Sequence, residues 1–323
     1  PQLIAGPIMR SSDFLPRLDL PSISRRRLND GIWLILGGLV KKVLLADPAG
    51  ALLGPVYHSP GLYEGWTILL AGMIFSLQVY CDFSGYTDIA RGCAYLLGYD
   101  IPENFRAPFF SRTGKELWAR WHITLATWLR DYIYFPLGGN RLGQFRTYFN
   151  LFITFTLGGF WHGADYTYIC WGAMWGLLLA FERLLEEKFS LALHKIKHPL
   201  LQGLQILFTF ILFSIGALMF RAQSVDYGTH TASSAQIMFS LLGGLFSQGS
   251  DVILSQFQGS RFELQQLTEV FGPDILAAAP LPQADSTLLL FGAVALFHWV
   301  QYRHGRLEAL RRHEIGSASC RER

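Results

Sequence analysis

The chain has 323 residues, of which 51% are hydrophobic and only 16% are charged, and its formal net charge is +3. Because soluble globular proteins carry about 25% charged residues, this composition disfavours an ordinary soluble domain. The small net charge also argues against a nucleic-acid-binding protein, which would need a concentrated basic surface.

Six apolar segments approach or reach the roughly 20 residues that a helix needs to cross a bilayer. In chain order they are residues 31–46, 65–81, 148–161, 168–181, 204–220 and 286–300. The first is interrupted by Lys41 and Lys42, which we expect to snorkel to an interface or to end the span. A soluble protein could bury one or two such helices but not this many, so the sequence predicts an all-α polytopic membrane bundle.

The chain shows no internal repeat and no long polar linker, so we expect residues 1–315 to form a single membrane domain. Its first residues, "PQLIAGPIMR", contain neither an initiating Met nor a signal-like region, which favours an N-terminally truncated chain. Residues 316–323, "GSASCRER", differ in composition from the rest and are interpreted as a non-native tail. Within the more polar stretch 221–285, residues 235–246 are predicted to form a short helix.

The middle third, from Asp82 to Arg146, mixes many charged residues with aromatic ones. Polar groups at membrane depth are tolerated where they face a cavity or protein. This region therefore predicts a polar funnel with re-entrant or short helices. We expect carboxylates such as Asp82, Asp88 and Asp131 to pair with basic residues or to cap helices, because buried charges need partners.

An aromatic and apolar stripe recurs at three- and four-residue steps between residues 116 and 134. This spacing predicts one face of a helix, which ends at "FPLGGNR" (135–141). Core packing is the favoured interpretation of the stripe, and an interfacial aromatic belt is the alternative. Its members are Trp118, Trp121, Leu125, Trp128 and Tyr132.

Two of the nine histidines, His122 and His162, directly follow a tryptophan and adjoin an apolar segment. Each is either a neutral buried imidazole with local partners or a group that can take a proton from a hydroxyl near neutral pH. The sequence contains no GxSxG, HExxH, Walker A or GxGxxG motif. General-base catalysis and proton-coupled transport remain as the chemical roles for these histidines.

Residues 78–141 and 149–176 closely resemble the membrane-bound O-acyltransferase family, particularly its bacterial branch that acetylates alginate and other polysaccharides. The most specific features are the pair Trp121–His122 and the triplet Trp161–His162–Gly163. The segments "PQLIAGPIMR" (1–10) and "FRAQS" (220–224) also resemble that branch.

This resemblance implies that an acyl group moves from a cytoplasmic thioester, such as acetyl-CoA, to a hydroxyl, with no bound cofactor or metal. It implies that His162 is the principal catalytic residue, as general base or by positioning the acceptor, and that His122 assists or orients. Candidates for the lining of the substrate channel are Trp121, Trp161, Asn104, Arg130 and Asp131.

We therefore expect a multi-pass protein of the bacterial inner membrane, surrounded by lipid, that does not bind nucleic acid. It would acetylate an alginate-like or cell-wall polysaccharide, directly or through a periplasmic acetyltransferase partner. One alternative is D-alanyl transfer to teichoic acid. Another is a proton-coupled or non-catalytic component of a polysaccharide export complex.

Overall fold

The computed structural model describes residues 6–10, 14–16, 23–63, 65–189, 196–228 and 231–246, together with Gly292, Leu296 and Trp299. In these ranges the chain is almost entirely helical, and two short strands pair antiparallel. The elements are α2 (Arg25–Leu39), η1 (Val40–Ala46), α3 (Asp47–His58), η2 (Pro60–Leu62), α4 (Gly65–Leu96), η3 (Pro108–Phe110), α5 (Gly114–Arg120), α6 (Ile123–Leu129), η4 (Arg130–Tyr134), α7 (Gln144–His162), α8 (Tyr166–Phe189), α9 (Pro199–Arg221), β1 (Val225–Asp226), β2 (Thr231–Ala232) and α10 (Ser234–Gly244).

The all-α prediction is confirmed over the described ranges. Three of the described helices, α4, α8 and α9, are long and apolar enough to cross a membrane, as predicted for 65–81, 168–181 and 204–220. Segments 31–46 and 148–161 are helical, in α2 with η1 and in α7, but neither belongs to these three. The helix predicted at 235–246 is α10. Segment 286–300, apart from three positions, and the tail 316–323 lie outside the described residues.

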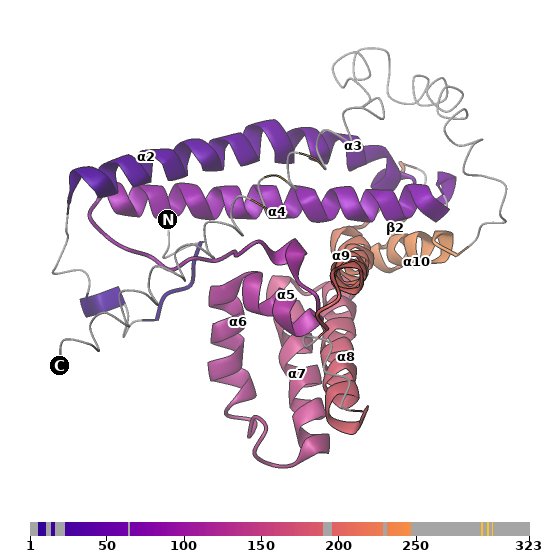
Figure 1. The fold of residues 1–323 in the computed structure, drawn as a ribbon. Helices are drawn as coiled ribbons and strands as arrows, with labels where there is room; N and C mark the ends of the chain where they lie inside the picture. Colours follow the sequence, from indigo (N-terminus) through magenta and orange to yellow (C-terminus); the bar gives the residue numbers. More distant parts are fainter. Residues whose placement is uncertain are drawn as a thin grey trace.

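Helices α2, η1 and α3 form one long rod that lies beside α4 (Figure 1). The two rods approach closely because glycines face each other across their interface. A Cβ atom built on Gly85 would lie 2.8 Å from the carbonyl oxygen of Gly38, and one built on Gly92 would lie 2.6 Å from that of Gly31. These positions therefore accept no larger side chain without separating the helices.

A buried ion pair joins the same two rods. The Lys41 ammonium is 1% exposed and lies 2.6 Å from the Asp88 carboxylate, whereas Lys42 is half-exposed and bridges Asp47 and Asp82. The expectation that Lys41 snorkels or ends the span is wrong, because Asp88 on α4 holds its charge inside the protein. The expectation that Asp82 and Asp88 pair with basic residues is confirmed.

Helices α5 to α8 form a second group that extends from one side of the rods, with α9 at the junction (Figure 1). In this group α7 and α8 pack as a hairpin, again through facing glycines: a Cβ atom on Gly159 would lie 3.1 Å from the Gly172 Cα and would overlap the Tyr168 carbonyl oxygen. This close contact fixes the C-terminal end of α7, where His162 lies.

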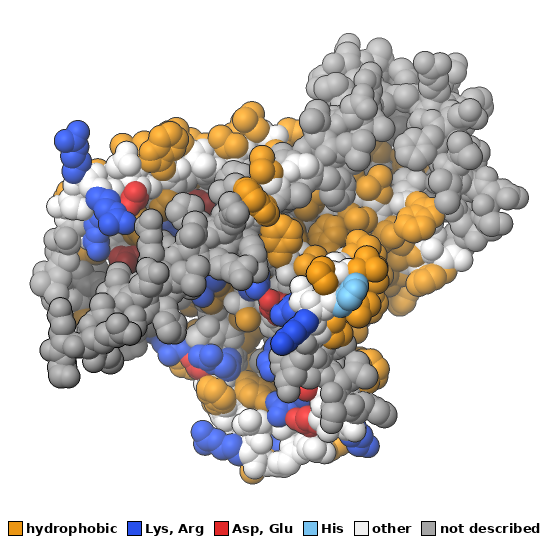
Figure 2. All heavy atoms as spheres, viewed as in Figure 1, with side chains coloured by type: hydrophobic (Ala, Val, Ile, Leu, Met, Phe, Trp, Pro, Cys, Tyr) orange, Lys and Arg blue, Asp and Glu red, His pale blue; other side chains and the backbone are white. Residues whose placement is uncertain are grey.

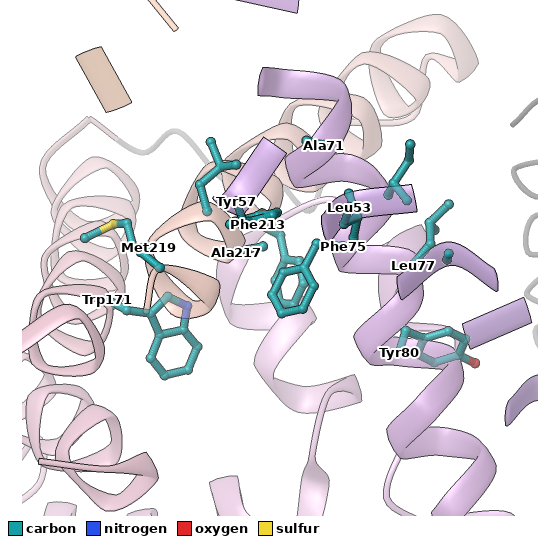
Figure 3. Packing of buried hydrophobic residues seen from close by; sticks show 14 of the residues in the cluster. Leu53, Tyr57, Ala71, Phe75, Leu77, Tyr80, Trp171, Phe213, Ala217 and Met219 are labelled. Atoms are coloured by element: carbon teal, nitrogen blue, oxygen red, sulfur yellow. The ribbon is translucent and has the colours of Figure 1, made fainter. Parts of the chain in front are cut away.

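Apolar side chains from the rods and from α8 and α9 form one core, whose members include Phe75, Trp171 and Phe213 (Figure 3). On the face shown in Figure 2, hydrophobic side chains cover much of the described surface, while charged ones gather where α2 begins and at the far end of the α5–α8 group. On α2 and η1, Trp33 and Leu44 are 66% and 65% exposed. Such an apolar exterior is typical of a surface that faces lipid.

Candidate active site

A break in the helical path positions His122. Helix α5 begins at Gly114, where the Thr113 hydroxyl accepts a hydrogen bond from the Glu116 backbone N–H, and it ends at Arg120. Trp121 is then extended, His122 takes left-handed backbone angles (φ 43°, ψ 53°), and α6 begins at Ile123. The single helix predicted over 116–134 is therefore wrong. A left-handed residue with a side chain costs about 1–2 kcal/mol, so tertiary contacts must hold His122 in place.

The His122 imidazole is 4% exposed and is enclosed by aromatic rings. Its centroid lies 4.7 Å from that of Phe83 and 6.5 Å from that of Phe105. Its Nδ1 atom forms a 3.1 Å hydrogen bond with Oδ1 of Asn104, which is itself fully buried. His122 lies outside the three candidate spans, and burial, with a smaller contribution from nearby His162, lowers its pKa to about 3. The ring is therefore neutral at physiological pH.

His162 is the last residue of α7, and its half-buried ring packs against rings from the next two helices. The centroid distances are 5.4 Å to Trp171 on α8 and 4.9 Å to Phe220 at the end of α9. The neighbouring residue Trp161 contacts both histidines, with its centroid 4.9 Å from that of His162 and 6.2 Å from that of His122. The two tryptophan–histidine motifs, 40 positions apart in the sequence, therefore meet in one aromatic cluster.

A cavity of about 940 Å³ opens among α5, α6, α7 and α8, and His122 is part of its lining. This volume lies within the range typical of small-molecule sites, about 300–1,000 Å³. Near His122 the lining is buried and largely apolar, as at Leu125 and Leu129. The more exposed lining carries charges of both signs: Arg112, Lys115, Arg130, Arg183, Glu116, Glu182, Glu186 and Glu187.

The structure places the other predicted residues in different surroundings. Arg130 lines the cavity, and the adjacent Asp131 pairs with Arg130 and Arg10 without being part of the lining. Trp121 is 7% exposed and packs in the aromatic core, 4.8 Å from Phe213 by ring centroids. This agrees with the core interpretation for Trp121 but not for the whole stripe, because Tyr132 is 56% exposed and Trp128 is only half-buried. His162 contacts the cluster through Trp161 and is not among the residues that line the cavity.

Two polar side chains of the cavity lining were missed in the sequence. The Trp118 Nε1 and Thr154 Oγ1 atoms are buried, and neither has a hydrogen-bond partner among the described residues. Thr154 is a polar residue within the apolar segment 148–161, which was the available signal, but Trp118 was assigned to packing alone. Since buried polar atoms are normally satisfied, both are suited to bind the polar groups of a ligand.

In the described ranges, no group of three or more His, Cys, Asp or Glu residues is arranged to hold a metal ion. The arrangement offers instead a neutral imidazole at the buried end of a cavity, a second imidazole across one tryptophan, and charged groups toward solvent. This set can bind a ligand that has a charged part and an apolar part, and it can move a proton at the ligand's buried end.

Comparison with known proteins gives matches to one family and to several of its curated members. The model of the membrane-bound O-acyltransferase family matches residues 1–220, a range that includes both histidines. The probable alginate O-acetylase AlgI of Pseudomonas putida is 37% identical over 299 residues, covering 90% of this chain and 54% of that protein. The peptidoglycan O-acetyltransferase of Helicobacter pylori is 34% identical over 232 residues, covering 70% and 43%.

A more distant match is the teichoic acid D-alanyltransferase of Streptococcus thermophilus, 32% identical over 193 residues and covering 55% of this chain and 46% of that protein. The chain therefore spans about half the length of the curated relatives it matches.

Proposed function

The chain belongs to the membrane-bound O-acyltransferase family, and on that premise we propose that the protein moves an acetyl group from a cytoplasmic thioester to a polysaccharide hydroxyl. The polymer is alginate-like or a cell-wall polysaccharide outside the cytoplasm, and the protein is a multi-pass component of the bacterial inner membrane. The names of the relatives from Pseudomonas putida and Helicobacter pylori support this choice of acyl group and acceptor.

One observation carries the proposal: the buried end of the cavity reaches His122, and Trp161 connects His122 to His162. We assign the cavity to the donor thioester. Basic side chains such as Arg112 and Lys115 at the more exposed lining are suited to the phosphates of coenzyme A. The apolar lining near His122 would hold the acyl arm, and Trp118 Nε1 would donate to a carbonyl oxygen of that arm.

The chemistry needs one proton acceptor and no redox partner. As the hydroxyl oxygen bonds to the acyl carbon, its proton passes to an imidazole nitrogen, and the same proton then goes to sulfur as the carbon–sulfur bond breaks. Of His162 and His122, one accepts the proton and the other holds the reacting group in position. A positioned general base contributes about 10²- to 10⁴-fold in rate.

The test is the ester content of cell polysaccharides when the gene is replaced by His162→Ala or His122→Ala variants. We expect both to lose acetylation while reaching normal levels in the membrane. The matched control is His198→Gln, because His198 is an exposed histidine at the start of α9, away from the cluster. Normal acetylation by a stably inserted His162→Ala protein would contradict the catalytic role proposed for His162.

D-alanyl transfer is the second candidate, favoured by the match to the Streptococcus thermophilus protein. The same ester analysis distinguishes D-alanyl transfer from acetyl transfer, because hydrolysis of the esters would release D-alanine in the first case and acetate in the second. A proton-coupled or non-catalytic role in polysaccharide export predicts altered polymer secretion with unchanged ester content per sugar. Transfer through a separate periplasmic acetyltransferase predicts that acetylation also stops when that partner is deleted.

A further inference from the structure

Helix α9 ends at a half-buried arginine, Arg221, that has no carboxylate partner among the described residues. Its Nη1 atom donates a hydrogen bond to Oε1 of Gln78 on α4 at 2.5 Å. Its guanidinium carbon lies 5.0 Å from the ring centroids of both Tyr57 on α3 and Phe75 on α4. These two rings, labelled in Figure 3, are 7% and 8% exposed, and their centroids are 6.0 Å apart. Aromatic faces and one amide therefore hold the cation without neutralising its charge.

The groups around Arg221 are rich in hydrogen-bond donors. A guanidinium has five N–H groups and no acceptor, and the bond to Gln78 uses one of the five. Because the Gln78 oxygen faces Arg221, its NH₂ group points elsewhere, and Nε2 lies 3.0 Å from a Cβ atom built on Gly50 of α3. The Tyr57 hydroxyl is buried and has no hydrogen-bond partner in the described part of the chain. One cation with these free donors is suited to bind a planar oxyanion such as a carboxylate.

Arg221 lies beside His162 and far from the exposed lining of the cavity that we assign to the donor. The ring of Phe220, the preceding residue, has its centroid 4.9 Å from that of His162 and 5.0 Å from that of Tyr168, at the start of α8. Glu187, in the exposed lining of the cavity, follows Tyr168 by 19 residues on the same helix. At 1.5 Å per residue this separation is about 28 Å, close to the roughly 30 Å thickness of the hydrocarbon core of a bilayer.

This arrangement places Arg221 on the acceptor side of the site. If the thioester enters through the exposed lining of the cavity, an acceptor outside the cytoplasm reaches His162 from the opposite end of α8. A lipid phosphate is also an oxyanion, but the rings beside Arg221 belong to the buried core and not to the apolar outer surface. This burial favours a ligand that enters between the helix ends over a lipid that lies along the outside of the protein.

We propose that Arg221, Tyr57 and Gln78 bind a carboxylate of the acceptor polysaccharide, so that a nearby hydroxyl of the same polymer is presented to His162. The guanidinium pairs with the carboxylate oxygens, and the Tyr57 hydroxyl and the Gln78 NH₂ group supply further donors. The acceptor is then an acidic polysaccharide built from uronic acid sugars, and a neutral glucan is a poor substrate. The inference rests on the proposed function and names the class of its acceptor.

The first measurement is the binding of a fluorescently labelled oligouronate to the full chain in phosphatidylcholine nanodiscs, without any donor. We expect Arg221→Gln to raise the Kd about 10- to 100-fold. Arg221→Lys should restore only part of the affinity, because an ammonium lacks the planar fork. The matched control is Arg26→Gln, which removes an exposed arginine on α2 and should leave the Kd unchanged. Equal Kd values for the unmodified protein and Arg221→Gln would overturn the proposal.

The ligand itself provides a control for charge. The same oligosaccharide with its carboxylates reduced to alcohols should bind the unmodified protein no better than the acidic form binds Arg221→Gln. Equal affinity of the unmodified protein for the acidic and the reduced oligosaccharides would show that the carboxylate is not recognised, and it would overturn the proposal without any variant.

Tyr57→Phe separates binding from stability. It keeps the ring against Arg221 and removes only the unpartnered hydroxyl, so the melting temperature in detergent should stay equal or rise. In acetyl transfer to the oligouronate we expect the acceptor KM to rise about 10-fold, with the donor KM unchanged. A purely structural Tyr57 would leave both KM values unchanged, and that result would contradict the proposal even if Arg221→Gln fails to insert into the membrane.

Phosphatidylglycerol tests the lipid alternative. We expect that adding it to the nanodiscs does not displace the oligouronate. Native mass spectrometry of Arg221→Gln provides the complementary test. If this variant loses bound phosphatidylglycerol while its affinity for the oligouronate is unchanged, the site binds a lipid and the proposal is overturned.

The two proposals fail in different ways. If His162→Ala retains normal acetylation, the proposed function fails, although the binding of the oligouronate without donor is unaffected. If both histidine variants lose acetylation while Arg221→Gln binds the oligouronate normally, the proposed function stands and the acceptor site at Arg221 fails.

Discussion

The rings of His122 and Trp161 meet edge to face, with centroids 6.2 Å apart and planes at 71°. Trp161 also contacts His162, at 4.9 Å and 81°. One indole therefore contacts two imidazoles, one at the break between α5 and α6 and one at the end of α7. Any change in the Trp161 side chain should alter the relative position of both histidines without removing either.

This relationship predicts that Trp161→Ala lowers the rate of acetyl transfer about 10- to 100-fold, because a displacement of about 1 Å in a catalytic group can cost this much. Trp161→Phe keeps a ring in contact and should lose much less. The control is Trp33→Ala, since Trp33 on α2 is 66% exposed and far along the chain from the cluster. Equal rates in Trp161→Ala and Trp33→Ala would mean that the indole does not position the histidines.

The close contact between α7 and α8 gives a second prediction. Gly159→Ala places a methyl group against the Tyr168 carbonyl and the Gly172 backbone, and overpacking of this kind costs about 1–3 kcal/mol. Because His162 follows three residues later, acetylation should also fall. The matched control is Gly203→Ala in α9, where an added Cβ meets no atom within 4 Å. That substitution should leave the melting temperature in detergent unchanged or slightly higher.

A melting temperature for Gly159→Ala equal to that of Gly203→Ala would show that the two helices separate without cost. The contact would then not fix the position of His162.

Hydropathy predicted α4, α8 and α9 because their length and composition depend on the bilayer alone. The helix break at His122 was not predictable, since Asn104, 18 residues earlier, stabilises it against the local helical pattern. The inward position of Lys41 likewise depends on Asp88, 47 residues later. The tryptophan–histidine pairs were singled out in the sequence because ionisable residues beside apolar segments are functional candidates, and the structure brings both pairs into one aromatic cluster.

The ligand-facing roles of the cavity residues also depend on contacts between segments that are far apart in the sequence. Trp118 and Thr154 differ from packing residues only in that their polar atoms lack partners after folding. Whether a polar atom is satisfied depends on residues from several helices, so the pattern of one segment cannot reveal it. Trp118 was therefore correctly expected on an inward face, while its place in the lining of the cavity was missed.

The third prediction concerns the contribution of the buried Lys41–Asp88 ion pair to stability. Lys41→Met leaves the Asp88 carboxylate without its buried partner, and breaking a buried pair costs about 3–5 kcal/mol. Lys42→Met should cost about 1 kcal/mol or less, because Lys42 and its partners are exposed to solvent. Thermal unfolding in detergent compares the two. The double variant Lys41→Met with Asp88→Leu should recover much of the loss, and no recovery would mean that the unpaired Asp88 carboxylate does not account for the cost of Lys41→Met.

The buried His122 ring gives a pH dependence with a definite sign. Burial lowers its pKa in the folded protein to about 3, whereas an unfolded histidine titrates near pH 6.5. Between about pH 6.5 and pH 3, His122 therefore binds a proton in the unfolded chain but stays neutral in the folded protein. Each further pH unit down to the folded pKa favours unfolding by up to about 1.4 kcal/mol through this one group.

The melting temperature of the unmodified protein in detergent should consequently fall between pH 7 and pH 5, and it should fall less in His122→Gln, which lacks this titration. His198→Gln removes an exposed histidine and should leave the pH dependence unchanged. Parallel decreases in the unmodified protein and in His122→Gln would show that His122 accepts a proton in the folded state as readily as in the unfolded chain. In that case burial would not lower the pKa of His122 in the folded protein.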